Sequence, residues 1–150
     1  MHWDFWIFLK HPLFIVAFVS WFLAQFLKIF TGDKIRLKDF FAAGGMPSSH
    51  SSSTVGLAAA CGIFLGFDNP IFIVTLVFSL VVMYDAANVR LESGKHAEII
   101  NDLVDFARTH KEFDAEKLKE IIGHEPFEVL MGALLGIAVA VVYFKLFYMM

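Results

Sequence analysis

The chain has 150 residues, is 58% hydrophobic and 16% aromatic, and carries a formal net charge of −3. A soluble globular domain is about 45–50% apolar, so this composition is typical of an integral membrane protein. The charge balance, without a basic tail or an arginine-rich run, argues against a nucleic-acid partner. A single cysteine, Cys61, excludes an internal disulfide. We expect one membrane-embedded domain over residues 1–150.

Four apolar segments follow one another along the chain, and each is close to the roughly 17–25 residues that cross a bilayer as a helix. The second is the shortest and the richest in Gly and Ala. Because small residues let helices approach closely, we expect it at the centre of the bundle. The pattern predicts an all-α fold, an integral membrane helical bundle with about four transmembrane helices. The segments run from Pro12 to Phe30, Ser51 to Phe67, Pro70 to Ala87 and Pro126 to Met150.

A polar stretch, Asp85 to Gly123, separates the third and fourth segments. Its apolar residues recur at helical spacing, which predicts two short amphipathic helices, Lys95 to Thr109 and Asp114 to Ile122. We expect these helices to lie on the cytoplasmic surface of the membrane or against the mouth of the bundle.

Lysine and arginine are concentrated in two links, the one between segments one and two and the one between segments three and four. With four spans both links face the same side, and the positive-inside rule places that side in the cytoplasm. The same topology gathers polar residues from four helix ends at one face of a multi-pass membrane protein. These residues are Lys28, His50, Asp85, Arg90, His124 and Glu128.

A turn rich in Gly and Ser precedes the second segment. Gly45, Ser48 and Ser49 offer N–H groups and hydroxyls to an anion, and His50 can donate a proton to a leaving group. The alternative is an interfacial histidine in a Ser-rich turn.

Lys28 stands near the end of the very apolar first segment, three residues after Gln25. If both face the bundle, the lysine ammonium can bind a phosphate. The alternative is a lysine that extends to the membrane surface.

His124 and Glu128 are four residues apart, so on a helical turn they share one face. A carboxylate bonded to one imidazole nitrogen fixes the tautomer and leaves the other nitrogen free as a nucleophile or base. The alternative is an exposed, solvated helix start. Arg90 either binds a phosphate through its planar fork or pairs with Asp85.

Three motifs carry a family resemblance: Gly44 to Ser51 (GGMPSSHS), Tyr84 to Arg90 (YDAANVR) and Gly123 to Gly132 (GHEPFEVLMG). Together they resemble the divergent branch of the type 2 phosphatidic acid phosphatase family, which is related to acid phosphatases and vanadium haloperoxidases. The resemblance implies a phosphohistidine mechanism. It makes His124 the nucleophile, Glu128 its orienting partner, His50 the acid for the leaving oxygen, and Lys28 a phosphate ligand.

The chain departs from the main family pattern at several points. The Arg-Pro pair after the lysine is absent, and residues 119–122 (KEII) stand where a Ser-Arg pair precedes the nucleophile. Glu128 replaces an aspartate and Ser49 replaces a glycine. Arg90 is therefore the candidate to supply one of the missing phosphate-binding arginines.

We predict a membrane lipid-phosphate phosphatase that hydrolyses a phosphomonoester or pyrophosphate of an acyl or prenyl lipid and needs no metal or cofactor. If both histidines contact one phosphate, their rings lie roughly 4–7 Å apart. Two alternatives are a metal-dependent hydrolase, with Asp85, Glu128, His50 and His124 as ligands, and a non-catalytic lipid-binding protein. The Gly/Ala-rich second segment and the Phe-rich faces also suggest a homodimer. The phosphate ligands are predicted to be Lys28, Arg90, Ser48, Ser49 and Gly45, supported by Asp85 and Gln25.

Overall fold

The computed structural model describes residues 5–31, 35, 37–41, 44–109, 118 and 123–149. All regular structure in these ranges is helical, which confirms the predicted all-α fold. The elements are the 3₁₀ helix η1 (Phe5–Lys10), α1 (Pro12–Thr31), the 3₁₀ helix η2 (Leu37–Phe41), α2 (Ser49–Leu65), α3 (Pro70–Tyr84), the π-helical turn η3 (Asp85–Val89), α4 (Arg90–Thr109) and α5 (Pro126–Tyr148).

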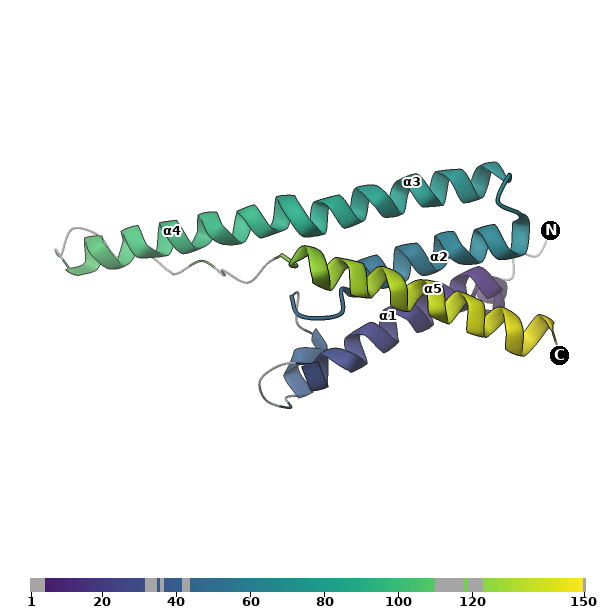
Figure 1. Cartoon of the computed structure of the whole chain (residues 1–150). Helices are drawn as coiled ribbons and strands as arrows, with labels where there is room; N and C mark the ends of the chain where they lie inside the picture. The colour runs from purple at the N-terminus through teal and green to yellow at the C-terminus, as the bar shows by residue number, and fades with distance from the viewer. Residues whose placement is uncertain are drawn as a thin grey trace.

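Helix α2 lies in the middle of the bundle and packs against α1, α3 and α5 (Figure 1). Its small side chains permit this position, because Ala58, Ala60, Cys61 and Gly62 are all buried. The apolar centre beneath the site is formed by Val16, Ala60 and Ala140, one residue from each of α1, α2 and α5.

Three helical segments of the described chain are long and apolar enough to cross a membrane. They are Pro12–Thr31, Pro70–Arg108 and Pro126–Tyr148. Helix α2 has 17 residues, which corresponds to about 25 Å at 1.5 Å per residue. Three of the four predicted spans are therefore long and apolar enough to cross a membrane, and the fourth, α2, is shorter and packs among them.

Helices α2 and α5 approach closely because glycines of α5 face the start of α2. A side chain at Gly132 would collide with the carbonyl oxygen of Ser48, and one at Gly136 would collide with the carbonyl oxygen of Ser52. Two glycines four residues apart are a common motif of close helix contact in membranes. On the other side of α2, the Ser52 hydroxyl donates a 3.0 Å hydrogen bond to the carbonyl of Ser20 in α1. These contacts fix the position of the first turn of α2 relative to α1 and α5.

The predicted amphipathic helix from Lys95 to Thr109 is present, but it begins earlier, at Arg90, and it is not separate from the third apolar segment. Helix α3 continues through η3 into α4, and the resulting rod extends past the end of the bundle (Figure 1). In η3 the N–H of Arg90 donates to the carbonyl of Asp85, five residues earlier, so the helix widens by one residue without breaking. Hydropathy changes abruptly at this point, whereas the helix continues without a break.

The second predicted amphipathic helix, Asp114 to Ile122, lies outside the described residues except for Leu118. The Leu118 main chain pairs with the Asn101 side chain of α4 through two hydrogen bonds of 2.8 Å. This contact places Leu118 beside α4.

Candidate active site

The turn before α2 is held in place by its own backbone and by two neighbouring elements. The Thr31 hydroxyl, at the end of α1, donates to the carbonyl of Met46, and the Ser48 N–H donates to the Glu128 carbonyl of α5 at 3.0 Å. Gly45 has φ +86°, a left-handed conformation that favours glycine. The turn thus delivers the first N–H groups of α2, which have no acceptors within the helix, to the top of the bundle.

Ser48 is the N-cap of α2, and its hydroxyl oxygen accepts hydrogen bonds from the N–H and the hydroxyl of Ser51. Ser48 is fully buried and Ser49 nearly so. A hydroxyl committed to capping is available to a ligand only if it exchanges partners. The proposed binding of phosphate by Ser48 and Ser49 therefore remains a prediction, and the helix N–H groups are the donors that the structure offers more directly.

His124 immediately precedes the capping residue of α5 and is only 1% exposed. Its backbone N–H donates to the carbonyl of Ala86 in η3 at 3.1 Å. Its Nδ1 lies 3.0 Å from Oε2 of Glu128. The same carboxylate oxygen accepts the N–H of Glu125 as part of a capping box. The fold therefore fixes both the main chain and the ring of His124.

A carboxylate only accepts hydrogen bonds, so the Glu128 contact assigns the ring proton of neutral His124 to Nδ1 and leaves a lone pair on Nε2. Among the described residues, Nε2 has no hydrogen-bond partner. Burial lowers the pKa of His124 below its ordinary value of 6.5, against the opposing influence of the Glu128 hydrogen bond, and the Lys28 charge lowers the pKa further. The main chain of Gly45 approaches the ring and raises the pKa, but it makes no well-formed hydrogen bond to Nε2. The lowered pKa favours the neutral form of the ring at pH 7.

His50, in the first turn of α2, lies next to the His124 ring. The ring centroids of His50 and His124 are 6.4 Å apart, with an angle of 65° between the planes. This distance falls inside the 4–7 Å range expected if both rings contact one phosphate. His50 is exposed whereas His124 is buried. An exposed ring is able to exchange protons with water, and a buried one is shielded from it.

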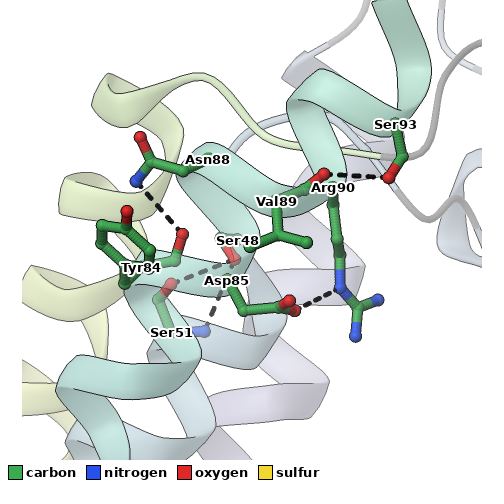
Figure 2. Close-up of polar contacts among 8 residues, drawn as sticks. All are labelled: Ser48, Ser51, Tyr84, Asp85, Asn88, Val89, Arg90 and Ser93. Atoms are coloured by element: carbon green, nitrogen blue, oxygen red, sulfur yellow. Dashed lines mark hydrogen bonds and ion pairs between the residues drawn. The ribbon is translucent and has the colours of Figure 1, made fainter. Parts of the chain in front are cut away.

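Two cations border the histidine pair. Lys28 is 4% exposed. Burial lowers the pKa of His50, and the charges of Arg90 and Lys28 lower that pKa further. Arg90 is turned back towards the π-helical turn, where its Nε lies 2.6 Å from Oδ2 of Asp85 (Figure 2). This ion pair was one of the two alternatives for Arg90. Because only Nε is used by Asp85, the two terminal nitrogens of the guanidinium can still serve as donors to an anion.

Gln25 is 8% exposed, and its Oε1 has no hydrogen-bond partner among the described residues. It lies one turn below Lys28 on α1, so both side chains face the interior of the bundle. The alternative in which Lys28 extends out to the membrane surface is wrong, because its side chain is buried.

Sequence reasoning missed the residues that hold the site together. A side chain at Gly123 would collide with the backbone of Leu91 at the start of α4. Gly123 thereby keeps His124 within reach of the Ala86 carbonyl. Gly132 and Gly136 allow α2 and α5 to approach closely, and their spacing of four residues was a usable signal of this contact in the sequence. No pattern in the sequence predicts the π-helical turn.

No group of three or more His, Cys, Asp or Glu side chains suited to a metal ion occurs within the described ranges. Of the four residues named as possible ligands, His124 pairs with Glu128 and Asp85 pairs with Arg90, while His50 stands opposite the first of these pairs.

Comparison with known proteins gives one family and one relative. Residues 9–139 match the Divergent PAP2 family. The chain is 37% identical over 112 residues to the uncharacterized membrane protein YuiD of Bacillus subtilis (strain 168). The aligned region covers 67% of this chain and 71% of the relative. No solved structure matches the chain significantly.

Proposed function

The chain belongs to the Divergent PAP2 family, and from that premise we propose that it is a membrane lipid-phosphate phosphatase with His124 as its nucleophile. The observation that carries the proposal is the arrangement of the two histidines. His124 is neutral, oriented by Glu128 through Nδ1, and has an unpartnered Nε2, and His50 lies 6.4 Å away between ring centroids. A nucleophile, its orienting group and a separate acid are the parts that covalent catalysis requires.

The proposed reaction has two steps. In the first, Nε2 of His124 attacks phosphorus, the Nε2–P bond forms, and the P–O bond to the lipid breaks. Protonated His50 gives its proton to the departing oxygen. In the second, water attacks the phosphohistidine, His50 accepts a proton from that water, and the P–N bond breaks to release phosphate. Both histidines are then ready for another cycle, and no net electron transfer occurs.

Stabilisation of the phosphoryl oxygens falls to the surrounding charges. Lys28 and Arg90 bring two positive charges, and the N-terminus of α2 adds N–H donors with a favourable helix dipole. Positioning and electrostatic stabilisation supply most of the rate enhancement in phosphoryl transfer. Arg90 compensates in part for the arginines that the main family pattern places elsewhere in the chain.

The site is proposed to face the cytoplasm. The supporting observation is the concentration of Lys and Arg in the two links at this end of the bundle, together with the positive-inside rule. The substrate phosphate would then enter from the membrane surface while its hydrocarbon part stays in the bilayer.

The test is phosphate release by the full-length chain in detergent, from a panel of phosphatidic acid, long-chain alkyl phosphates and prenyl pyrophosphates, with and without EDTA. We expect release that persists in EDTA, is abolished in His124→Ala, and is unchanged in His96→Ala, whose side chain is exposed on α4. Equal activity in His124→Ala and the parent would overturn the proposal. Loss of activity on chelation, restored by one metal, would favour the metal-dependent alternative. No turnover of any lipid phosphate would favour the lipid-binding alternative.

A further inference from the structure

A groove of about 350 Å³ lies between α2, α3 and α5, separate from the histidine pair. Its floor includes Ala58 and Ala59 of α2, and its walls include Phe72 and Leu76 of α3 and Ile137 of α5. Every residue that lines it is apolar. Its volume falls within the range of about 300–1,000 Å³ found for small-molecule sites.

The groove exists because two small side chains, Ala58 and Ala59, lie at its floor and because its two walls are apart. Helix α3 packs against α2 but has little contact with α5. The side chains of Leu76 and Ile137 are partly exposed at the two walls, at 37% and 43%. The groove is therefore open at the side, towards the hydrocarbon region of a bilayer.

The walls of the groove are the helices that carry the candidate active site. Helix α3 continues through η3, which begins at Asp85, to Arg90, and α5 begins two residues after His124. Along α2 the groove starts at Val55, five residues after His50. At 1.5 Å per residue this is about 7–8 Å below the histidine, measured along the helix axis. The groove thus starts just beneath the site and extends into the membrane.

We propose that this groove binds the hydrocarbon chain of the lipid phosphate whose phosphate is held by His124 and His50. The proposal rests on the proposed function and adds to it the position of the lipid's hydrocarbon chain. A transmembrane helix of a second copy is about 10–12 Å wide and does not fit into a groove of this volume. A polar headgroup finds no partner on the apolar lining. A single linear acyl, alkyl or prenyl chain is narrow enough for the groove and is apolar like its lining.

Two variants test the groove without touching the site. Leu76→Trp and Ile137→Trp fill it from opposite walls, and both positions are partly exposed, so the larger ring does not disturb the bundle core. The matched controls, Val74→Trp and Val142→Trp, lie on the same helices at 67% and 54% exposure and do not line the groove. We compare kcat/KM for a long-chain alkyl phosphate and for butyl phosphate.

The expected result is a loss of about fivefold or more in kcat/KM for the long-chain substrate in both groove variants, which corresponds to roughly 1 kcal/mol of lost packing. Hydrolysis of butyl phosphate and the activity of both controls should stay at the parent level. Equal kcat/KM for the long-chain substrate in all five proteins would overturn the groove assignment while leaving the phosphatase intact.

A second measurement does not depend on turnover. An alkyl phosphate with a diazirine at the chain end is photo-crosslinked to the parent, and the labelled residues are mapped by mass spectrometry. We expect label on the groove walls, suppressed in Leu76→Trp and retained in Val74→Trp. Label spread evenly over the lipid-facing helices would contradict the inference. Groove labelling without any phosphate release would refute the proposed catalysis but not the binding site.

Discussion

Oε2 of Glu128 lies 3.0 Å from Nδ1 of His124 and thereby determines which nitrogen of the buried imidazole can react. The contact is local, since both residues belong to one helix start, yet it is held by distant parts of the chain. The Ala86 carbonyl fixes the main chain of His124, and Ser48 donates its N–H to the Glu128 carbonyl. Most of the expected behaviour of the site follows from this arrangement.

Removal of the Glu128 carboxylate should impair catalysis more than stability. Glu128→Ala is expected to lower kcat by roughly 10²-fold or more, because His124 loses the partner that fixes its tautomer. Glu128→Gln should retain more activity, since its amide oxygen can still accept from Nδ1. Glu125→Ala is the control, because it removes the other half of the capping box and leaves the His124 contact. Similar losses in the Glu125 and Glu128 variants would indicate a purely structural role.

Activity should depend on pH through His124. Its pKa is lowered from 6.5 by burial, so the neutral, nucleophilic form persists below that pH. The acidic limb of the kcat/KM profile is therefore expected at a pH below 6.5. In Glu128→Gln the limb should move to still lower pH, because the Glu128 carboxylate raises the pKa of His124. An acidic limb above pH 6.5 would contradict the assignment.

The same shift has a consequence for stability. Unfolding exposes His124, whose pKa returns to about 6.5, so in mildly acidic solution the unfolded state binds more protons than the folded state. The contribution of His124 to the free energy of unfolding is full above pH 6.5. It falls as the pH drops below 6.5 and levels off below the pKa of the folded state. Thermal unfolding in detergent should show a smaller decrease with acid in His124→Gln than in the parent.

Arg90 should act through its fork and not only through its charge. Arg90→Lys keeps the positive charge but cannot bind two phosphate oxygens in one plane, so kcat/KM should fall about tenfold, or roughly 1.4 kcal/mol. Asp85→Asn should produce a smaller loss, since the ion pair at 2.6 Å orients the guanidinium (Figure 2). Arg108→Lys, at the far end of α4, is the control. Unchanged kcat/KM in Arg90→Lys would remove Arg90 from the phosphate site.

The contact between α2 and α5 should be intolerant of side chains at the glycines of α5. Gly136→Val forces a side chain against the Ser52 carbonyl and is expected to lower the free energy of unfolding by about 1–3 kcal/mol. Leu134→Val, on the same helix at 51% exposure, should change it by less than about 0.5 kcal/mol. Chemical unfolding in detergent provides the comparison. If Gly136→Val and Leu134→Val lower the free energy of unfolding equally, the glycines do not determine how closely α2 and α5 approach.

The sequence predicted the helices well, because hydropathy and proline positions determine them directly. Pro12, Pro70 and Pro126 each begin the helix that was expected to start there. Charge and topology together also placed His50 and His124 at the same face of the bundle, and their ring centroids are 6.4 Å apart. The proximity of the two histidines requires only that four helix ends lie at the same end of the bundle, which follows from the order of the segments.

The continuous rod of α3 and α4 could not be predicted in the same way. The change from an apolar to a polar sequence near Asp85 resembles the end of a helix, whereas the structure passes through this point with a π-helical turn. No residue pattern encodes such a turn, and its contact in the structure is with a distant residue, since the Ala86 carbonyl accepts the His124 N–H. Likewise, the capping role of Ser48 competes with the ligand role expected from composition, and only the folded turn shows which partner its hydroxyl has.

The central claim is that His124 forms a covalent bond to phosphorus, and rapid-quench labelling tests it most directly. The full-length chain is mixed with a ³²P-labelled long-chain alkyl phosphate, quenched under alkaline denaturing conditions, and digested for peptide mapping. The account predicts label on the peptide that contains His124, acid-labile and base-stable, and absent in His124→Ala. Turnover of the substrate without such label, or equal label in His124→Ala, would contradict it.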